Sequence, residues 1–116
     1  MKKDLVIFLK HILESIDSIE EYIEGIDREQ FKLKKQTQDA VIRRLEIIGE
    51  AVKNLPNKFT KEYNDIPWSE IARMRDKLIH KYFGVDLDLT FDVTKDDLPK
   101  LRNKINKIIK EISKEE

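Results

Sequence analysis

The sequence predicts an all-α protein, an up-and-down bundle of about four to five helices. Apolar residues recur at steps of three and four along most of the chain, which is the period of an amphipathic helix rather than of a strand. The connections between these segments are short, and they hold most of the few glycines and prolines, three of each. Because the chain has 116 residues and neither a linker nor a repeat, we expect one domain spanning 1–116.

The first helix is predicted from Lys3 to Gly25. Gly25 can end it by adopting a left-handed backbone conformation, and Asp27 with Gln30 three residues later resembles a capping box that opens the next helical turn. The predicted buried face of this helix consists of Leu5, Phe8, Leu9, Ile12, Leu13, Ile16, Ile19 and Ile23.

A second long helix is predicted to end before Pro56, with Phe31 and Leu33 in a short turn that leads into it. Gly49 lies inside this helix, where glycine costs helix stability relative to alanine. We therefore expect a neighbouring helix to come close at Gly49. The predicted apolar stripe consists of Val41, Leu45, Ile48, Val52 and Leu55.

The stretch "PNKFTKEYNDIP" is rich in turn-forming residues and has room for one helical turn. Asp65 and Pro67 suit the start of a third helix, which we expect to continue as far as Gly84. Trp68 is expected to anchor the core, the alternative being a platform on which a base stacks. The predicted buried face consists of Trp68, Ile71, Met74, Leu78 and Tyr82.

The segment from Leu87 to Val93 fits either a strand or a helix, because it combines β-branched and aromatic residues. We favour a helix, since no second strand is predicted that could pair with it. Asp97 and Pro99 are expected to restart the chain into a final helix. The predicted buried face of that helix consists of Leu101, Ile105, Ile108, Ile109 and Ile112.

Composition limits the classes of partner and site. Charged residues make up 40% of the chain, with 23 basic and 23 acidic, so the balanced charge offers no global support for a nucleic-acid or membrane partner. The lack of cysteine excludes disulfides and thiolate metal sites and fits a cytoplasmic location. Lys10 and His11 interrupt the apolar run near the N-terminus, so no signal peptide or membrane span is expected. Glu46 and Glu50 could face one cation, but no third ligand is in register, so no metal site is expected.

The stretch "RDKLIHKYF", residues 75–83, gathers several reactive side chains, including one of only two histidines. On the predicted third helix, Asp76 and His80 lie four residues apart and share a face, where the carboxylate could accept a hydrogen bond from the imidazole. Arg75 would lie about 140 degrees round the helix from His80 and roughly 7.5 Å along it. These two side chains would therefore converge only through the long reach of Arg75 or through a second copy of the helix. On spacing alone, a solvated charged face is the better explanation.

The same residues match a known signature. Arg75 to His80 resemble the motif of the HEPN superfamily of helical ribonucleases, and "RDKLIHKY", which adds Tyr82, resembles the HepT branch. The resemblance covers almost the whole chain, because "AVIRRLEIIGEAVKNLP" and "DDLPKLRNKINKII" match as well. It implies a HEPN fold and a homodimer, whose two motif helices face each other across a cleft that binds and cuts RNA without a metal ion or other cofactor.

Arg75 and His80 are the catalytic residues that this resemblance implies, with Asp76 in a supporting role, orienting either His80 or the opposing arginine. The chemistry is consistent with that assignment. Attack of a ribose 2′-hydroxyl on its neighbouring phosphate needs one group to take a proton, another to give one, and a cation to stabilise the phosphorane charge. Two motifs related by a two-fold axis would supply two histidines and two arginines.

HepT proteins are toxins of type VII-like toxin–antitoxin systems, paired with a nucleotidyltransferase antitoxin called MntA that modifies the motif tyrosine with AMP. The resemblance implies that this tyrosine is Tyr82. From its pattern alone, Tyr82 could equally be an aromatic residue packed at the end of a helix.

Two stripes of basic residues are relevant to whether the protein binds RNA. Arg73, Lys77 and Lys81 are spaced by four on the predicted third helix, and they are candidate RNA-binding residues. A second stripe, better explained as solvated surface, consists of Lys100, Lys104 and Lys107. An alternative function stays open, in which a non-catalytic HEPN module binds a nucleotide or docks a nucleotidyltransferase. A purely structural bundle would leave the motif unexplained.

Overall fold

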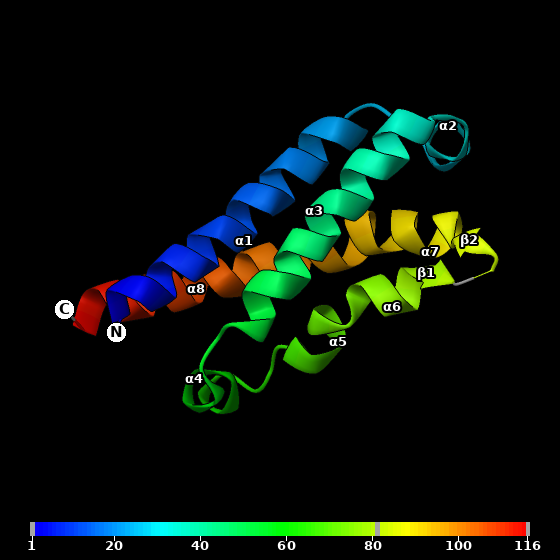
Figure 1. Ribbon diagram of the computed structural model, residues 1–116. Helices are drawn as coiled ribbons and strands as arrows, with labels where there is room; N and C mark the ends of the chain where they lie inside the picture. Colours follow the sequence, from blue (N-terminus) through cyan, green and yellow to red (C-terminus); the bar gives the residue numbers. More distant parts are fainter. Residues whose placement is uncertain (1, 81, 116) are drawn as a thin grey trace.

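The computed structural model describes residues 2–80 and 82–115 (Figure 1). The body of the molecule is built from the long helices α1 (Lys2–Ile23), α3 (Lys35–Lys53) and α8 (Leu98–Glu115). α1 packs against both α3 and α8 and runs antiparallel to each of them (Figure 1). The start of α1 and the end of α8 therefore lie together at one end of the molecule. The predicted all-α bundle is confirmed.

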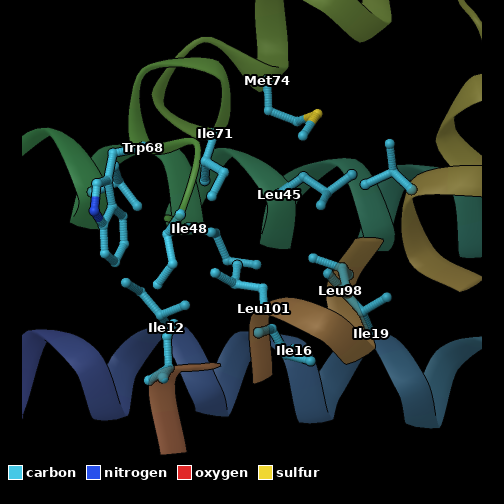
Figure 2. Close-up of a cluster of buried hydrophobic side chains, with 14 of the residues drawn as sticks. Ile12, Ile16, Ile19, Leu45, Ile48, Trp68, Ile71, Met74, Leu98 and Leu101 are labelled. Carbon is cyan, nitrogen blue, oxygen red and sulfur yellow. The ribbon is translucent and has the colours of Figure 1, made fainter. Parts of the chain in front are cut away.

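The core lies between these long helices (Figure 2). Ile12 and Ile16 of α1 point toward Ile48 of α3 and Leu101 of α8, and burying each such side chain stabilises the fold by about 1.5–3 kcal/mol. The predicted stripes are confirmed, because their buried members include Leu9, Ile12, Ile16, Ile19, Ile23, Val41, Leu45, Ile48, Val52, Leu55, Leu101, Ile105, Ile108 and Ile112. Among the described helices, none is both long enough and apolar enough to cross a membrane.

The link between α1 and α3 follows its predicted chemistry. Gly25 has a φ of +70°, which glycine adopts without steric cost, and it ends α1. The Asp27 carboxylate then accepts from the backbone N–H of Gln30 at 2.8 Å, while the Gln30 side chain accepts from the Asp27 N–H at 3.0 Å. This capping box opens the short helix α2 (Arg28–Leu33), where Phe31 is buried.

α3 approaches α5 (Trp68–Ala72) closely at Gly49. A Cβ atom at this position would lie 3.3 Å from the backbone carbonyl oxygens of both Ile71 and Ala72. Such a distance is tighter than most Cβ contacts, so glycine lets the two backbones come together. The close contact predicted for Gly49 is confirmed.

The turn-rich segment holds one short helix, α4 (Asn57–Glu62), as predicted. Phe59 of α4 is buried and packs against the ring of Trp68, with 5.7 Å between the ring centroids. The indole N–H of Trp68 donates to the Tyr63 carbonyl oxygen at 3.0 Å, so its one polar group is satisfied inside the core. Trp68 is therefore a core anchor, and the base-stacking alternative is wrong.

The prediction of one continuous third helix from Trp68 to Gly84 is wrong. The chain forms α5, bends at Arg73, forms α6 (Met74–Leu78) and then turns into a small hairpin. The strands of this hairpin are β1 (Ile79–His80) and β2 (Gly84–Val85). The stretch around it is rich in β-branched and aromatic residues, which lose side-chain freedom in a helix. Pairing with β2 supplies the backbone hydrogen bonds that a longer helix would have made.

The segment after the hairpin is helical, as predicted, although the two short strands before it were not predicted. α7 (Leu87–Asp92) continues through a π-helical segment, η1 (Val93–Asp97), into α8 without the break expected there. Within this transition the Leu98 N–H donates to the Val93 carbonyl, five residues earlier. Pro99 has no N–H and crowds the carbonyl four residues before it, so the chain widens locally instead of restarting.

α2 and α7 are joined by a cluster of ion pairs. Arg28 donates to Asp92 at 2.5 Å and to Asp88 at 3.3 Å, and Lys32 also donates to Asp88 at 3.3 Å. The hydrogen bond from Lys32, followed by that from Arg28, lowers the pKa of the Asp88 carboxyl below its ordinary value. This cluster holds α7 in place directly after the hairpin.

Candidate active site

The motif residues gather at the end of the molecule opposite the chain termini, on α6 and the β1–β2 hairpin (Figure 1). Arg75 and Asp76 lie on α6, and His80 is the last residue of β1. All three side chains are exposed, whereas Met74 and Leu78 of α6 face the core. α6 therefore presents the polar motif to solvent while its apolar face fixes the helix to the bundle.

The hairpin gives His80 an outward direction. Its paired residues are Ile79 with Val85 and His80 with Gly84, so the half-buried aliphatic pair faces inward and the other pair faces solvent. Gly84 has a φ of +76°, a left-handed conformation that favours glycine. Opposite residues of an antiparallel pair share a face, and glycine has no side chain, so no neighbouring side chain of β2 stands beside the imidazole.

Two hydrogen bonds fix the hairpin at its tip and its base. The Phe83 N–H donates to the His80 carbonyl at 3.2 Å, which closes the tip. At the base, the Asp86 N–H donates to the Leu78 carbonyl at 2.8 Å. The Asp86 carboxylate also accepts from the Leu89 N–H at 3.0 Å and so caps α7. Asp86 thus connects the motif to the helix that follows it.

Arg75 has a partner that the sequence does not predict. Its Nε–H donates to Glu46 Oε2 on α3 at 3.1 Å, between residues that are 29 positions apart. No local pattern links the two, and the only signal in the sequence is that Glu46 borders the buried stripe of α3. Within the described residues the terminal guanidinium nitrogens of Arg75 have no partner, so they remain able to grip phosphate oxygens. Glu50 pairs with Lys53 instead, at 3.3 Å.

The predicted pairing of Asp76 with His80 is wrong for a single chain. It assumed that both residues lie on one helix, but β1 begins after Leu78 and turns the backbone away. No hydrogen bond or ion pair joins Asp76 to His80 in the described part of the chain. The predicted angle between Arg75 and His80 round a helix fails for the same reason.

The basic residues do not form the continuous helical stripe expected. Arg73 is exposed at the bend between α5 and α6, while Lys77 lies on α6, and Lys81 falls outside the described residues. Lys77 borders a cavity of about 200 Å³ between α3, α5, α6 and the start of α8. The floor of this cavity is apolar, and Lys100 and Lys104 of the second stripe stand at its rim. In the described part of the molecule, no group of three His, Asp or Glu side chains is placed to hold a metal ion.

Tyr82 stands at the tip of the hairpin, where its side chain is 82% exposed. The prediction that it belongs to the buried face of a helix is therefore wrong. Its neighbour Phe83 is 89% exposed. The hairpin tip thus carries two aromatic side chains within three residues of His80.

Comparisons with known proteins show the family to which the chain belongs. The family model described as "Ribonuclease HepT-like" matches residues 12–108. A Methanocaldococcus jannaschii protein named "Gamma-glutamylcyclotransferase and putative RNase" is 59% identical over 98% of this chain, which spans 51% of that longer relative. A Thermococcus cleftensis protein named "Probable ribonuclease HepT" is 51% identical, with 95% of this chain and 100% of the relative covered. A "Putative RNase" of Caldanaerobacter subterraneus is 42% identical over 88% of this chain and 91% of its own length. No solved structure matches the chain.

Proposed function

This chain belongs to the HepT-like ribonuclease family, and on that premise we propose that it is the metal-independent RNA endonuclease of a type VII-like toxin–antitoxin system. We take residues 1–116 as a single domain of this family. The observation that carries the proposal is the joint exposure of Arg75 and His80 at one end of the bundle, with Arg75 held by Glu46. A purely structural bundle gives no reason for that arrangement.

The residues fit cleavage by internal transfer. A ribose 2′-oxygen attacks the adjacent phosphorus, its proton passes to a base, and the bond to the leaving 5′-oxygen breaks as that oxygen is protonated. A histidine serves either proton transfer at neutral pH, because imidazole ordinarily titrates near pH 6.5. We assign both roles to His80 and its symmetry mate. Arg75 stabilises the phosphorane charge through its terminal nitrogens.

A homodimer completes this chemistry. One chain carries one motif histidine, whereas the reaction uses an acid and a base together. A two-fold axis beside α6 and the hairpin would place both copies of His80 and Arg75 around one cleft. Since no hydrogen bond or ion pair joins Asp76 to His80 in the described part of one chain, we assign Asp76 to orient the arginine of the opposing chain.

Tyr82 is the proposed site of silencing by an MntA-like nucleotidyltransferase. Its high exposure supports access by a second enzyme, and it stands two residues from His80. Transfer of AMP to the phenol oxygen would release pyrophosphate from ATP and leave a negatively charged phosphodiester at the hairpin tip. That charge and bulk would compete with the RNA phosphate. Arg73, Lys77 and Lys81 are the basic residues that we propose along the RNA path.

The proposal is tested by RNA cleavage with purified protein in EDTA, after intact mass has excluded nucleotide adducts. Cleavage that survives chelation, leaves 2′,3′-cyclic phosphate ends and is lost in His80→Ala and Arg75→Ala is the expected result. A wild type that cuts no class of RNA but binds a nucleotidyltransferase tightly would overturn it. The non-catalytic binding module would then be the better description.

A further inference from the structure

The hairpin tip exposes aromatic surface that the proposed chemistry does not use. Of the aromatic side chains in the described residues, only Tyr82 and Phe83 are exposed, and the others are buried or half-buried. Tyr82 has a proposed role as the modified residue. Phe83 has none, although 89% of it faces solvent and leaving a ring in water forgoes the stabilisation of burial.

The backbone holds Phe83 at a fixed place relative to His80. The Phe83 N–H donates to the His80 carbonyl at 3.2 Å, and Gly84, which follows, has a left-handed φ of +76°. Gly84 is also the cross-strand partner of His80, and a Cβ built on it would meet no atom within 4 Å other than those of its two chain neighbours. The surface beside His80 is therefore open on the side of β2, and Phe83 stands next to that opening.

We propose that Phe83 is a base-stacking residue that selects single-stranded RNA, by receiving the face of a nucleobase next to the phosphate that is cut. This inference rests on the proposed ribonuclease function and assigns its substrate class. Bases show their faces only where the strand is unpaired, and exposed aromatic side chains are the usual platforms for them. Stacking does not depend on which base is present, so the expected preference is for single strands rather than for one sequence.

Apart from the proposed homodimer contact beside α6 and the hairpin, the charges around the tip favour RNA over another protein as the occupant. Residues 73–83 include four basic side chains and one acidic side chain, a local excess of positive charge in a chain that is neutral overall. A stable protein interface buries on the order of 800 Å² per partner, mostly through clustered apolar residues. Two exposed aromatic residues in a basic stretch of sequence fit a nucleotide better than they fit such an interface.

The test uses full-length protein carrying His80→Ala, so that RNA is bound and not cut, with a short fluorescein-labelled single-stranded RNA as the probe. Adding Phe83→Ala or Phe83→Leu is expected to weaken binding on the order of 10- to 100-fold, the range for loss of one stacked base. Phe83→Trp should keep the affinity because indole retains a stacking face. Ile7→Ala is the matched control, since Ile7 is an exposed apolar residue on the first turns of α1, at the far end of the molecule.

The same RNA annealed to its complement should be cut poorly by protein with His80 intact, and Phe83→Ala should change that duplex rate little. If the wild type cuts single-stranded RNA and the Phe83→Ala variant binds and cuts it equally well, the stacking inference is wrong. The proposed ribonuclease function would then remain supported. Full retention of affinity by Phe83→Leu would also overturn it. If Phe83→Ala lowers affinity only by converting dimers to monomers in sedimentation, the tip is a protein contact. If the wild type cuts no RNA, the proposed function itself fails.

Discussion

The Arg75 Nε–H group donates to Glu46 Oε2 at 3.1 Å, which ties a motif side chain to the long helix α3. Arg75 is 59% exposed and Glu46 is 31% exposed, so water screens the pair on one side. Ion pairs of this kind contribute about 0.2–1 kcal/mol to stability. The main effect of the contact is therefore on the direction of the guanidinium, and we expect Glu46 to act as a positioning residue.

Glu46→Ala is expected to lower kcat/KM for RNA cleavage by about tenfold, because an untethered Arg75 spends less time in the productive orientation. Glu46→Gln should lose less, since its amide oxygen still accepts the Nε–H bond. Melting temperature should change little in both variants. Glu50→Ala is the matched control, as Glu50 is an exposed carboxylate one turn further along α3. Equal losses in Glu46→Ala and Glu50→Ala would refute a positioning role.

Gly49→Ala is expected to destabilise the fold. The added Cβ would press on two backbone carbonyl oxygens at 3.3 Å, and such overpacking costs about 1–3 kcal/mol. The gain in helix propensity, about 1 kcal/mol, offsets part of that cost. Urea unfolding measures the net change. Arg43→Ala, at an exposed position of the same helix, should stay within about 0.5 kcal/mol of the wild type, and a Gly49→Ala protein as stable as this control would contradict the expectation.

Gly84→Ala is expected to impair cleavage more than stability. A Cβ at Gly84 meets open space, so any effect comes from its φ of +76°, which costs an L-residue roughly 1–2 kcal/mol. The tip would relax and carry His80 and Phe83 out of place, while the buried core stays intact. Gly84→Asn should keep more activity, because asparagine tolerates this conformation better. Cleavage rates and circular-dichroism melts of the two variants separate these effects, and unchanged cleavage in Gly84→Ala would count against a role for the fixed tip.

Acid is expected to weaken the attachment of α7 to α2. Hydrogen bonds from Lys32 and Arg28 depress the pKa of Asp88 in the folded state below the unfolded value of 3.8. The ionised carboxylate therefore stabilises the fold at neutral pH, and its contribution is lost as pH falls through the unfolded and then the folded pKa. Urea unfolding of the wild type and Asp88→Asn should differ at about pH 7 and converge at about pH 2. Asp96→Asn, at an exposed carboxylate of η1, is the control, and a pH-independent difference for Asp88→Asn would contradict the linkage.

The parts of the fold that local chemistry decides could be predicted from the sequence. The capping box of Asp27 and Gln30 acts across three residues, and the apolar stripes of α1, α3 and α8 repeat within each turn. Gly49 was predictable for a similar reason, because glycine inside a helix suggests a close neighbour. Each of these signals lies within a short stretch of chain, and no long-range contact overrides the local structure that it favours.

The sequence pointed to candidate site residues, whose roles stay predictions, but it did not predict their geometry. The motif identified Arg75 and His80 through resemblance, but a helical reading of "KLIHKYFG" put His80 on the wrong element. Two contacts decide its real position: the pairing of Ile79 with Val85, and the hydrogen bond from Asp86 to Leu78. The apolar residues from Trp68 to Tyr82 follow a helical period, so the sequence pattern indicates neither of these contacts. The partner of Arg75 on α3 depends on tertiary packing, which no local pattern carries.

The start of α1 and the end of α8 lie together, and the hairpin with His80 lies at the opposite end (Figure 1). A polypeptide fused to either terminus would therefore extend away from the motif and leave its surroundings unobstructed. Immobilising the protein through a terminal tag should likewise keep the hairpin accessible to a large ligand. The same separation suits modular reuse, and the Methanocaldococcus jannaschii relative, of which this chain spans 51%, is an instance of similar sequence within a longer polypeptide.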